Sequence, residues 1–353
     1  MKVYLAMPMQ SKLGLEAKMN TRKAIKELIP YEVNSPKNMI RLDANESSEG
    51  MMNQFTMTLN RYPDNQASAL RDKLADYLSV DKNELLLANG SSELIELLMK
   101  TYLEKGDQLL GFENSFSMYK IFSTIYEVDY VTIENDYLMD MDLLIQTAIE
   151  KQPKMVMVCN PNNPTGYLIS KCDIERLLKN YDGLVVIDEA YIEFTEASML
   201  NRLDQYENLI ILRTFSKAWG LAGARVGYMV ASSGVVKNVM KVKAPYSLNT
   251  LSQQAALYAL ENIAWMKDNV TKVIENREYV YSEMSQLGYK VYKSFANFIY
   301  FEATEELNQD LLNAGVMIRS FGSGKYRVTI TRNDDYRAFL NVLGGQVLCE
   351  KVS

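Results

Sequence analysis

The chain has 353 residues, 48% of them hydrophobic, with a formal net charge of −6 and a pI near 5.1. This length allows two or three average domains or one large α/β enzyme subunit. The acidic balance excludes a bulk electrostatic attraction to nucleic acid or to an anionic membrane. No apolar run reaches the roughly 18 residues that span a bilayer, and Met1–Met19 lack the long apolar segment of a signal peptide.

The sequence contains no histidine. This excludes Ser-His-Asp and Cys-His catalysis and any metal site that uses histidine, so proton transfer falls to Lys, Tyr, Cys, a carboxylate or a cofactor. The cysteines Cys159, Cys172 and Cys349 are scattered without CxxC spacing, which is typical of a reducing cytoplasm. We therefore expect a cytoplasmic protein without a metal site and without nucleic-acid or membrane partners.

Apolar spacing predicts alternating helices and strands over the first two thirds of the chain. A helical N-terminal arm at 20–30 is followed by an extended segment at 39–43. Further helices are predicted at Ala67–Leu78, Leu94–Tyr102, Tyr119–Tyr126, Met141–Ile149 and Lys171–Asn180. Strands are predicted at Leu85–Ala88, Gln108–Gly111, Tyr130–Ile133, Met155–Cys159, Leu184–Ile187, Leu209–Leu212 and Val226–Val230. This alternation indicates a largely parallel sheet with helices on both faces.

The pattern changes after Ala244. A long helical region is predicted at Thr250–Leu287. Strands and a closing helix follow at 297–301, 316–319, 326–330 and 334–343. We interpret this part as a smaller α+β domain, which gives a large domain at 45–248 and a small domain made of 20–44 and 249–348.

Residues that could hold a phosphate surround Lys217. Thr214 and Ser216 precede this lysine just beyond a predicted strand, and Arg225 follows it in a glycine-containing segment. Hydroxyls and a guanidinium can bind a phosphate monoester while a lysine amine attacks an aldehyde. A lone lysine in this place would be an ordinary surface residue.

Other polar residues lie next to predicted strands. Asp188 ends a buried strand, where α/β proteins place their ligands, and Asn160–Gly166 follow another strand. Ser91 and Ser92 stand where the cap of a helix is expected, and a helix N-terminus favours phosphate. Each feature alone has another explanation. Asn160–Gly166 could be an ordinary turn, Ser91 and Ser92 a helix cap, and Asp188 a metal ligand or a helix cap. Tyr191 could be a half-buried core tyrosine.

Together these segments resemble the fold-type I, aspartate-aminotransferase-like enzymes that depend on pyridoxal 5′-phosphate (PLP), most closely the histidinol-phosphate aminotransferase group. The matching segments occur in the family's order over roughly residues 20 to 345. They are Leu42–Glu46, Asn60–Asp64, Asn89–Glu93, Asn162–Gly166, Asp188–Phe194, Arg213–Lys217 and Gly223–Gly227. The resemblance implies an α/β protein of the PLP-dependent transferase fold type I, with a mainly parallel large-domain sheet and a smaller α+β domain.

The resemblance also implies roles for single residues. Lys217 would carry the cofactor as a Schiff base and shuttle the proton, and Asp188 would pair with the pyridinium nitrogen. Asn163 and Tyr191 would hold the ring oxygen. Phe116 would stack on the ring, although the usual Pro-Thr before it is replaced by Asn114-Ser115.

The implied phosphate site involves two subunits. Its residues within one chain would be Ser91, Ser92, Thr214, Ser216 and Arg225. Tyr62 matches a tyrosine that reaches the phosphate of the neighbouring subunit's cofactor. The resemblance therefore implies a homodimer with shared active sites.

Three residues match positions that bind the substrate's acidic group. Arg327 matches the arginine that binds this group, and Tyr31 and Arg319 match the other phosphate contacts of the histidinol-phosphate group. Two arginines can offer paired N–H forks to a dianion, although Arg319 could equally be a solvent-facing strand end. The usual Gly-Thr after this strand is replaced by Thr331-Arg332, which either shifts specificity or alters a surface turn.

The implied reaction is transamination of L-histidinol phosphate with 2-oxoglutarate, which gives imidazole acetol phosphate and glutamate in histidine biosynthesis. Alternatives are an aromatic amino-acid aminotransferase and a decarboxylase of a phosphorylated amino acid such as O-phosphothreonine. A sensory module of a transcription regulator is disfavoured, because no basic helix-turn-helix pattern appears and Lys217, Asp188 and Arg225 are intact.

Overall fold

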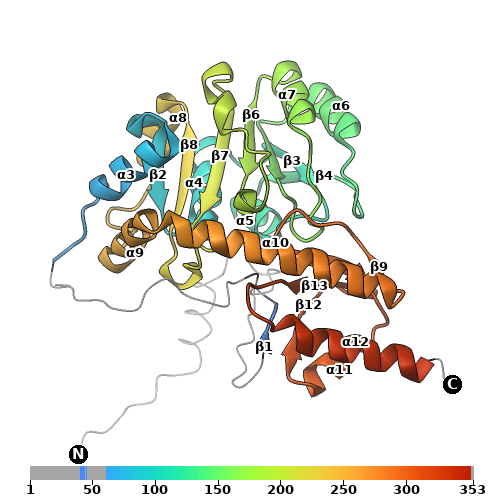
Figure 1. Cartoon of the computed structure of the whole chain (residues 1–353). Helices are drawn as coiled ribbons and strands as arrows, with labels where there is room; N and C mark the ends of the chain where they lie inside the picture. The colour runs from blue at the N-terminus through green and yellow to red at the C-terminus, as the bar shows by residue number, and fades with distance from the viewer. Residues whose placement is uncertain (1–39, 44, 46–60, 351–353) are drawn as a thin grey trace, which may run out of the picture.

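The structure, a computed structural model, describes residues 40–43, 45 and 61–350. It has a larger part built on one wide sheet and a smaller part beneath it, with a long helix running between the two (Figure 1). The helix expected at 20–30, and Tyr31 with it, lie outside the described residues.

A seven-stranded sheet forms the centre of the larger part. Across the sheet the order is β2 (Leu85–Ala88), β8 (Gly227–Ala231), β7 (Leu209–Thr214), β6 (Leu184–Asp188), β5 (Met155–Cys159), β3 (Gln108–Phe112) and β4 (Asp129–Ile133). All pairs from β7 to β4 are parallel, and β8 is antiparallel to both of its neighbours. The predicted α/β fold with a largely parallel sheet is confirmed.

Helices cover both faces of this sheet (Figure 1). They are α3 (Ser68–Leu78), α4 (Ser91–Tyr102), α5 (Met118–Tyr126), α6 (Met141–Lys151), α7 (Lys171–Asn180) and α8 (Ser233–Met240). Alternate residues of β5 enter different cores: Met157 joins the core that includes α3 and α4, whereas Val158 joins that of α6 and α7. Burying each such side chain contributes about 1.5–3 kcal/mol, and the two-residue period of a strand divides these side chains between the two faces.

The long helical region predicted at Thr250–Leu287 is present, but it consists of two helices. The structure has α9 (Thr250–Glu261) and α10 (Ile263–Gln286), which meet at Asn262. Asn262 has a non-helical backbone with φ −120° and ψ 40°, and its side-chain amide donates to the carbonyl of Tyr258 at 2.8 Å. Asparagine side chains compete in this way with backbone hydrogen bonds, which accounts for the break.

The smaller part contains a four-stranded sheet in the order β12 (Arg319–Ser320), β13 (Lys325–Thr329), β10 (Phe298–Glu302) and β9 (Lys290–Val291). Helices α11 (Leu307–Asn313) and α12 (Tyr336–Glu350) belong to the same part. A separate pair joins β1 (Ile40–Arg41) to β11 (Val316–Met317) in parallel. The strand predicted at 316–319 is therefore wrong as one element, because β11 and β12 lie in different sheets.

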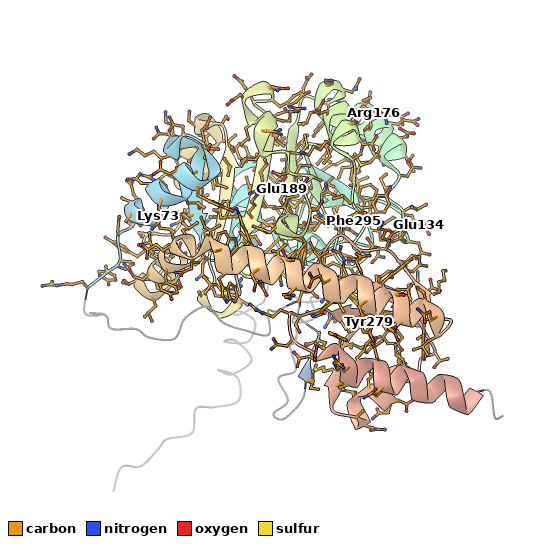
Figure 2. All side chains as sticks on the ribbon, in the orientation of Figure 1. Lys73, Glu134, Arg176, Glu189, Tyr279 and Phe295 are labelled. Carbon is orange, nitrogen blue, oxygen red and sulfur yellow. The ribbon has the colours of Figure 1, made fainter. Side chains whose placement is uncertain are left out.

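Helix α10 connects the two parts. Near its start, Asn269 donates to the carbonyl of Ala218 in the larger part at 2.8 Å. Near its end, the ring of Tyr279 lies 5.8 Å from that of Tyr336 on α12 (Figure 2). The domain boundaries expected from the sequence stay a prediction. Within the described residues, no helix combines the length and the apolar character needed to cross a membrane.

Candidate active site

A pocket opens at the carboxyl edge of the large sheet, where β5, β6 and β7 end. Its lining residues are Ser91, Ser92, Phe116, Cys159, Asn163, Asp188, Ala190, Tyr191, Thr214, Ser216, Lys217 and Arg225. The structure thus brings together every residue that the sequence singled out for the cofactor except Tyr62. Ligands of open parallel sheets bind at this edge.

The N-terminus of α4 forms one wall of the pocket. Gly90 occupies the cap position with φ 81° and ψ 164°, so Ser91 and Ser92 lie in the first turn and the prediction that they cap the helix is wrong. A β-carbon at Gly227 would collide with the backbone of Gly90 and Ser91. Glycine at position 227 therefore lets β8 approach the helix end, where backbone N–H groups and the helix dipole favour an anion.

Two hydroxyls and a guanidinium complete this polar end. Nη1 of Arg225 donates to Oγ of Ser216 at 3.3 Å, and Oγ1 of Thr214 lies 2.9 Å from the same Ser216 oxygen. Together with the start of α4 they provide hydroxyl, guanidinium and backbone donors. Charge-assisted hydrogen bonds of this kind suit a phosphate dianion.

Lys217 and Asp188 enter the pocket from neighbouring strands. β6 ends at Asp188, and Lys217 lies in the loop just beyond β7. The Nζ atom of Lys217 lies 5.8 Å from the ring centroid of Tyr191. Burial has the largest effect on the pKa of Asp188 and raises it, and the charge of Lys217 is the smallest of the effects that lower it.

The Asp188 carboxylate is buried and held by two donors. Oδ2 accepts a hydrogen bond from the hydroxyl of Tyr119 at 2.8 Å, and Oδ1 accepts one from the backbone N–H of Ala190 at 3.2 Å. Burial raises the pKa of Asp188 to about 6, and these two hydrogen bonds oppose the rise. Sequence reasoning missed Tyr119. The available signal was its position three residues after Phe116, at the start of the predicted helix, and the ring of Phe116 meets that of Tyr119 edge-on at 5.7 Å.

Asn45 links Tyr191 to the smaller part of the protein. Its side-chain amide donates to the hydroxyl of Tyr191 at 3.1 Å, and its backbone N–H donates to Oγ1 of Thr329 on β13 at 2.8 Å. Burial raises the pKa of Tyr191, so this phenol stays protonated at neutral pH. Asn45 falls in a segment that matched the family, yet its side chain carried no assigned role in the sequence.

Arg327 is held by several contacts at the small-domain side of the pocket. Its guanidinium donates through Nη1 to Oδ1 of Asn163 and through Nη2 to the carbonyl of Asp43 at 2.7 Å. The rings of Phe298 and Phe321 lie 5.2 Å and 5.8 Å from its Cζ atom. The guanidinium therefore touches the pocket wall at Asn163 in a single defined orientation.

Arg319 on β12 lies opposite Arg327 on β13, and the two strands are antiparallel. The two residues are directly opposite each other in the register of β12 and β13, so their side chains leave the same face of the sheet. Arg319 is exposed, whereas Arg327 is buried. Tyr31, the third residue expected at this site, is outside the described part of the chain.

The side chain of Arg332 lies against α10. Its guanidinium lies 3.1 Å from the Asp268 carboxylate and 5.9 Å from the ring centroid of Trp265. The backbone carbonyls of Thr331 and Arg332 both accept from the side chain of Asn276. Of the two interpretations of the Thr331-Arg332 replacement, the structure favours an altered turn that packs on α10.

Tyr62 lies outside the pocket of its own chain. Its side chain is 82% exposed, and its ring stacks on that of Tyr246 with centroids 4.8 Å apart. The structure of one chain therefore does not bring Tyr62 to the residues proposed for the phosphate.

The pocket has the parts that PLP requires. The residues around Ser216 and Arg225 fit a phosphate, the Lys217 amine can condense with an aldehyde, and the Asp188 carboxylate can pair with a pyridine nitrogen. A parallel sheet that presents these groups at its carboxyl edge defines a PLP-type α/β enzyme.

Comparison with known proteins places the chain more closely. Residues 36–343 match the model of the family described as aminotransferase class I and II. A histidinol-phosphate aminotransferase of Caldanaerobacter subterraneus subsp. tengcongensis is 37% identical over 91% of this chain and 97% of its own. That of Thermoanaerobacter pseudethanolicus is 38% identical over 88% and 93%.

Solved structures agree in fold. The crystal structure of histidinol-phosphate aminotransferase from Sinorhizobium meliloti, determined in complex with PLP, superposes with a TM-score of 0.85 at 20% identity. The match covers 94% of this chain and 98% of the other. The chain belongs to the aminotransferase class I and II family. The expected enzyme class and the expected cofactor, PLP, are thereby confirmed, whereas the roles of individual residues stay predictions.

Proposed function

We propose that the protein transfers the amino group of L-histidinol phosphate to 2-oxoglutarate, giving imidazole acetol phosphate and glutamate. The observation that carries this proposal is the cross-strand pair of Arg319 and Arg327, in which Arg327 contacts the pocket residue Asn163. The relatives named histidinol-phosphate aminotransferase support it, at up to 38% identity over most of the chain.

Arg319 and Arg327 offer two guanidinium groups to an anion from one face of the sheet. Like charges directly opposite on neighbouring strands destabilise a sheet by an amount of order 0.2–1 kcal/mol. A phosphate dianion would reverse the sign of this interaction and accept N–H groups from both guanidinium forks. Arg327 is already oriented by Asn163 and Asp43, so it would lose little further freedom on binding.

In this proposal the chain's own groups bind and orient the reactants. PLP, when bound, supplies an aldehyde for amines and a ring that withdraws electrons from the substrate Cα. Lys217 would bind the aldehyde carbon and then move the Cα proton with its Nζ atom. The Asp188 carboxylate would hold the proton on the ring nitrogen, while the Tyr191 hydroxyl and the Asn163 amide would hold the ring oxygen.

The remaining residues would fix the ring and the phosphate. Phe116 would cover one face of the ring. The phosphate would receive hydrogen bonds from Ser91, Ser92, Thr214, Ser216 and Arg225. The burial of Asp188, Tyr191 and Thr214 would keep water away from these groups.

We also infer that the enzyme is a cytoplasmic homodimer with shared active sites. Tyr62 and Tyr246 form an exposed stacked pair outside the pocket. If a second copy of the chain covered this pair, Tyr62 would reach the cofactor phosphate bound by that second copy. The scattered cysteines support a reducing compartment.

A substrate panel tests the function. Purified protein with PLP would be offered histidinol phosphate, phenylalanine, tyrosine or O-phosphothreonine, with and without 2-oxoglutarate. We expect the largest kcat/KM for histidinol phosphate and glutamate formation only when the 2-oxo acid is present. A preference for the free aromatic amino acids would overturn the proposed substrate, and carbon dioxide release without any 2-oxo acid would identify a decarboxylase instead.

A further inference from the structure

The hydrogen bond between Tyr119 and Asp188 connects two distant segments inside the core. The Tyr119 hydroxyl donates to Oδ2 of Asp188 at 2.8 Å across a sequence separation of 69 residues. Tyr119 on α5 is 0% exposed and Asp188 at the end of β6 is 2% exposed. Both residues of this hydrogen bond are therefore shielded from bulk water.

Asp188 is held by two donors and also lines the pocket. The N–H of Ala190 binds one carboxylate oxygen and Tyr119 binds the other, so the plane of the carboxylate is fixed from the protein side. Several titratable or charged groups interact electrostatically with Asp188. They are Tyr119 on α5, Cys159 on β5, Lys217 beyond β7, the adjacent Glu189, and Tyr191 three residues further along the chain. Within the described part of the chain, Tyr119 donates to this carboxylate from its side chain, whereas Ala190 donates from its backbone.

We propose that Tyr119 is a positioning residue whose hydroxyl keeps the Asp188 carboxylate ionised and directed at the ring nitrogen of the cofactor. This inference rests on the proposed role of Asp188. The pairing of Asp188 with the ring nitrogen does not by itself determine which of the two groups carries the shared proton. The inference concerns the position of that proton.

Burial makes the position of that proton sensitive to small effects. A buried ion pair competes with a neutral pair in which the proton has moved to the carboxylate, because low polarity disfavours both charges. Burial raises the pKa of Asp188 to about 6, and the hydrogen bond from Tyr119 is the largest effect that lowers it. Loss of a charge-assisted hydrogen bond shifts such an equilibrium about 10- to 100-fold.

A tyrosine suits this task because it remains a donor. Burial, and next the neighbouring Asp188 charge, raise the pKa of Tyr119 well above its usual value. The phenol therefore keeps its proton throughout the neutral range. Without it, more of the ring nitrogen would lose its proton to Asp188, and a neutral ring withdraws electrons from Cα poorly.

The decisive variant is Tyr119→Phe in the full chain, which removes one oxygen atom and keeps the ring. The first measurement is the pH titration of the Asp188 carboxyl group, monitored by ¹³C NMR in protein free of cofactor. Asp188→Asn identifies the Asp188 signal, because it removes that signal from the spectrum. We expect the Asp188 pKa to rise by about one unit or more in Tyr119→Phe. With PLP added, we expect kcat to fall about 10- to 100-fold with little change in KM, since the lost bond acts on the chemical step.

Tyr181→Phe is the matched control. Tyr181 is also buried at 2% exposure and its hydroxyl also donates to one acceptor, the carbonyl of Pro153, but it belongs to the core on the α6 and α7 side of the sheet. Its loss should lower thermal stability to a similar extent and leave the Asp188 titration unchanged. Tyr119→His, which keeps a ring N–H donor, should recover part of the activity lost in Tyr119→Phe and serves as the test protein if the phenylalanine variant does not fold.

A double-mutant cycle separates positioning from packing. In an Asp188→Asn background there is no carboxylate to keep ionised, so adding Tyr119→Phe should cause little further loss. An equal loss in both backgrounds, or an unchanged Asp188 titration in Tyr119→Phe, would overturn the inference. The titration requires no substrate, so its outcome stands even if the substrate panel overturns the proposed function.

Discussion

Gly90 and Arg225 lie so close together that position 90 has no room for a β-carbon, which would collide with the Arg225 guanidinium. Gly90 also adopts φ 81° and ψ 164°, a backbone region that is essentially reserved for glycine. The residue before α4 thus allows the helix start and the arginine to face the same space, where we propose that the cofactor phosphate binds.

Gly90→Ala should therefore weaken both the fold and cofactor binding. The backbone conformation alone costs a non-glycine residue about 1–3 kcal/mol, and the collision would displace Arg225 from the phosphate site. We expect a lower denaturation midpoint and a dissociation constant for PLP that is raised about tenfold or more, measured by fluorescence titration. Gly223→Ala is the control, because a β-carbon there meets nothing within 4 Å; equal PLP affinity in the two variants would contradict the expectation.

Lys217→Ala should abolish turnover and the absorption band of covalently bound cofactor together. Among the described residues, Lys217 is the lysine that lines the pocket. Its loss therefore removes both the covalent attachment of the cofactor and the proposed proton carrier. Absorption spectra and single-turnover assays measure the two effects. Lys237→Ala, on the exposed side of α8, should change neither, and a Lys217→Ala protein that kept both properties would disprove the assignment.

Arg319→Gln should raise the KM for a phosphorylated amino donor by about tenfold or more. Charge-assisted hydrogen bonds contribute roughly 1.5–3 kcal/mol, and Arg319 stands opposite Arg327 on the same sheet face. The matched control is Arg332→Gln, because that guanidinium binds Asp268 on α10. Steady-state kinetics with histidinol phosphate should separate the two variants; equal KM values would remove Arg319 from the substrate site.

Local sequence patterns predict the pocket well because its main residues follow strand ends directly. Asp188 ends β6 and Lys217 follows β7, and a parallel sheet places such ends at one edge. The burial of each strand on both faces gives the continuous apolar runs that mark it in the sequence. No side-chain geometry is needed to reach this part of the site.

Contacts between distant segments are not encoded in such patterns. The bond between Tyr119 and Asp188 depends on how α5 packs against the sheet, and helical spacing alone cannot distinguish a core tyrosine from a functional one. The direction of Arg332 depends on its tertiary contact with Asp268. The break at Asn262 depends on a single side-chain hydrogen bond that interrupts an otherwise continuous helical pattern.

Glu193→Gln should stabilise the protein at alkaline pH and not at acidic pH. Glu193, a half-buried residue whose Oε2 atom is shielded from solvent, lies in the field of a buried ion pair in which Arg213 binds Glu189 at 2.9 Å (Figure 2 labels Glu189). Trp219 Nε1 lies 3.4 Å from one Glu193 oxygen. Burial raises the pKa of Glu193 from 4.5 to about 7, against the opposing charge of Arg213.

The sign follows from proton binding. Between pH 4.5 and 7 the folded protein binds more protons at Glu193 than the unfolded chain does, so stability falls as the pH rises through this window. Glutamine removes the titration, and the variant should gain up to roughly 3 kcal/mol at pH 8 and almost nothing at pH 4. Urea denaturation at the two pH values measures this difference. Glu196→Gln, at an exposed position of the same loop, should stay within about 0.5 kcal/mol of the unmodified protein at both; a gain for Glu193→Gln that is equal at pH 4 and pH 8 would show that the carboxyl does not titrate as its burial requires.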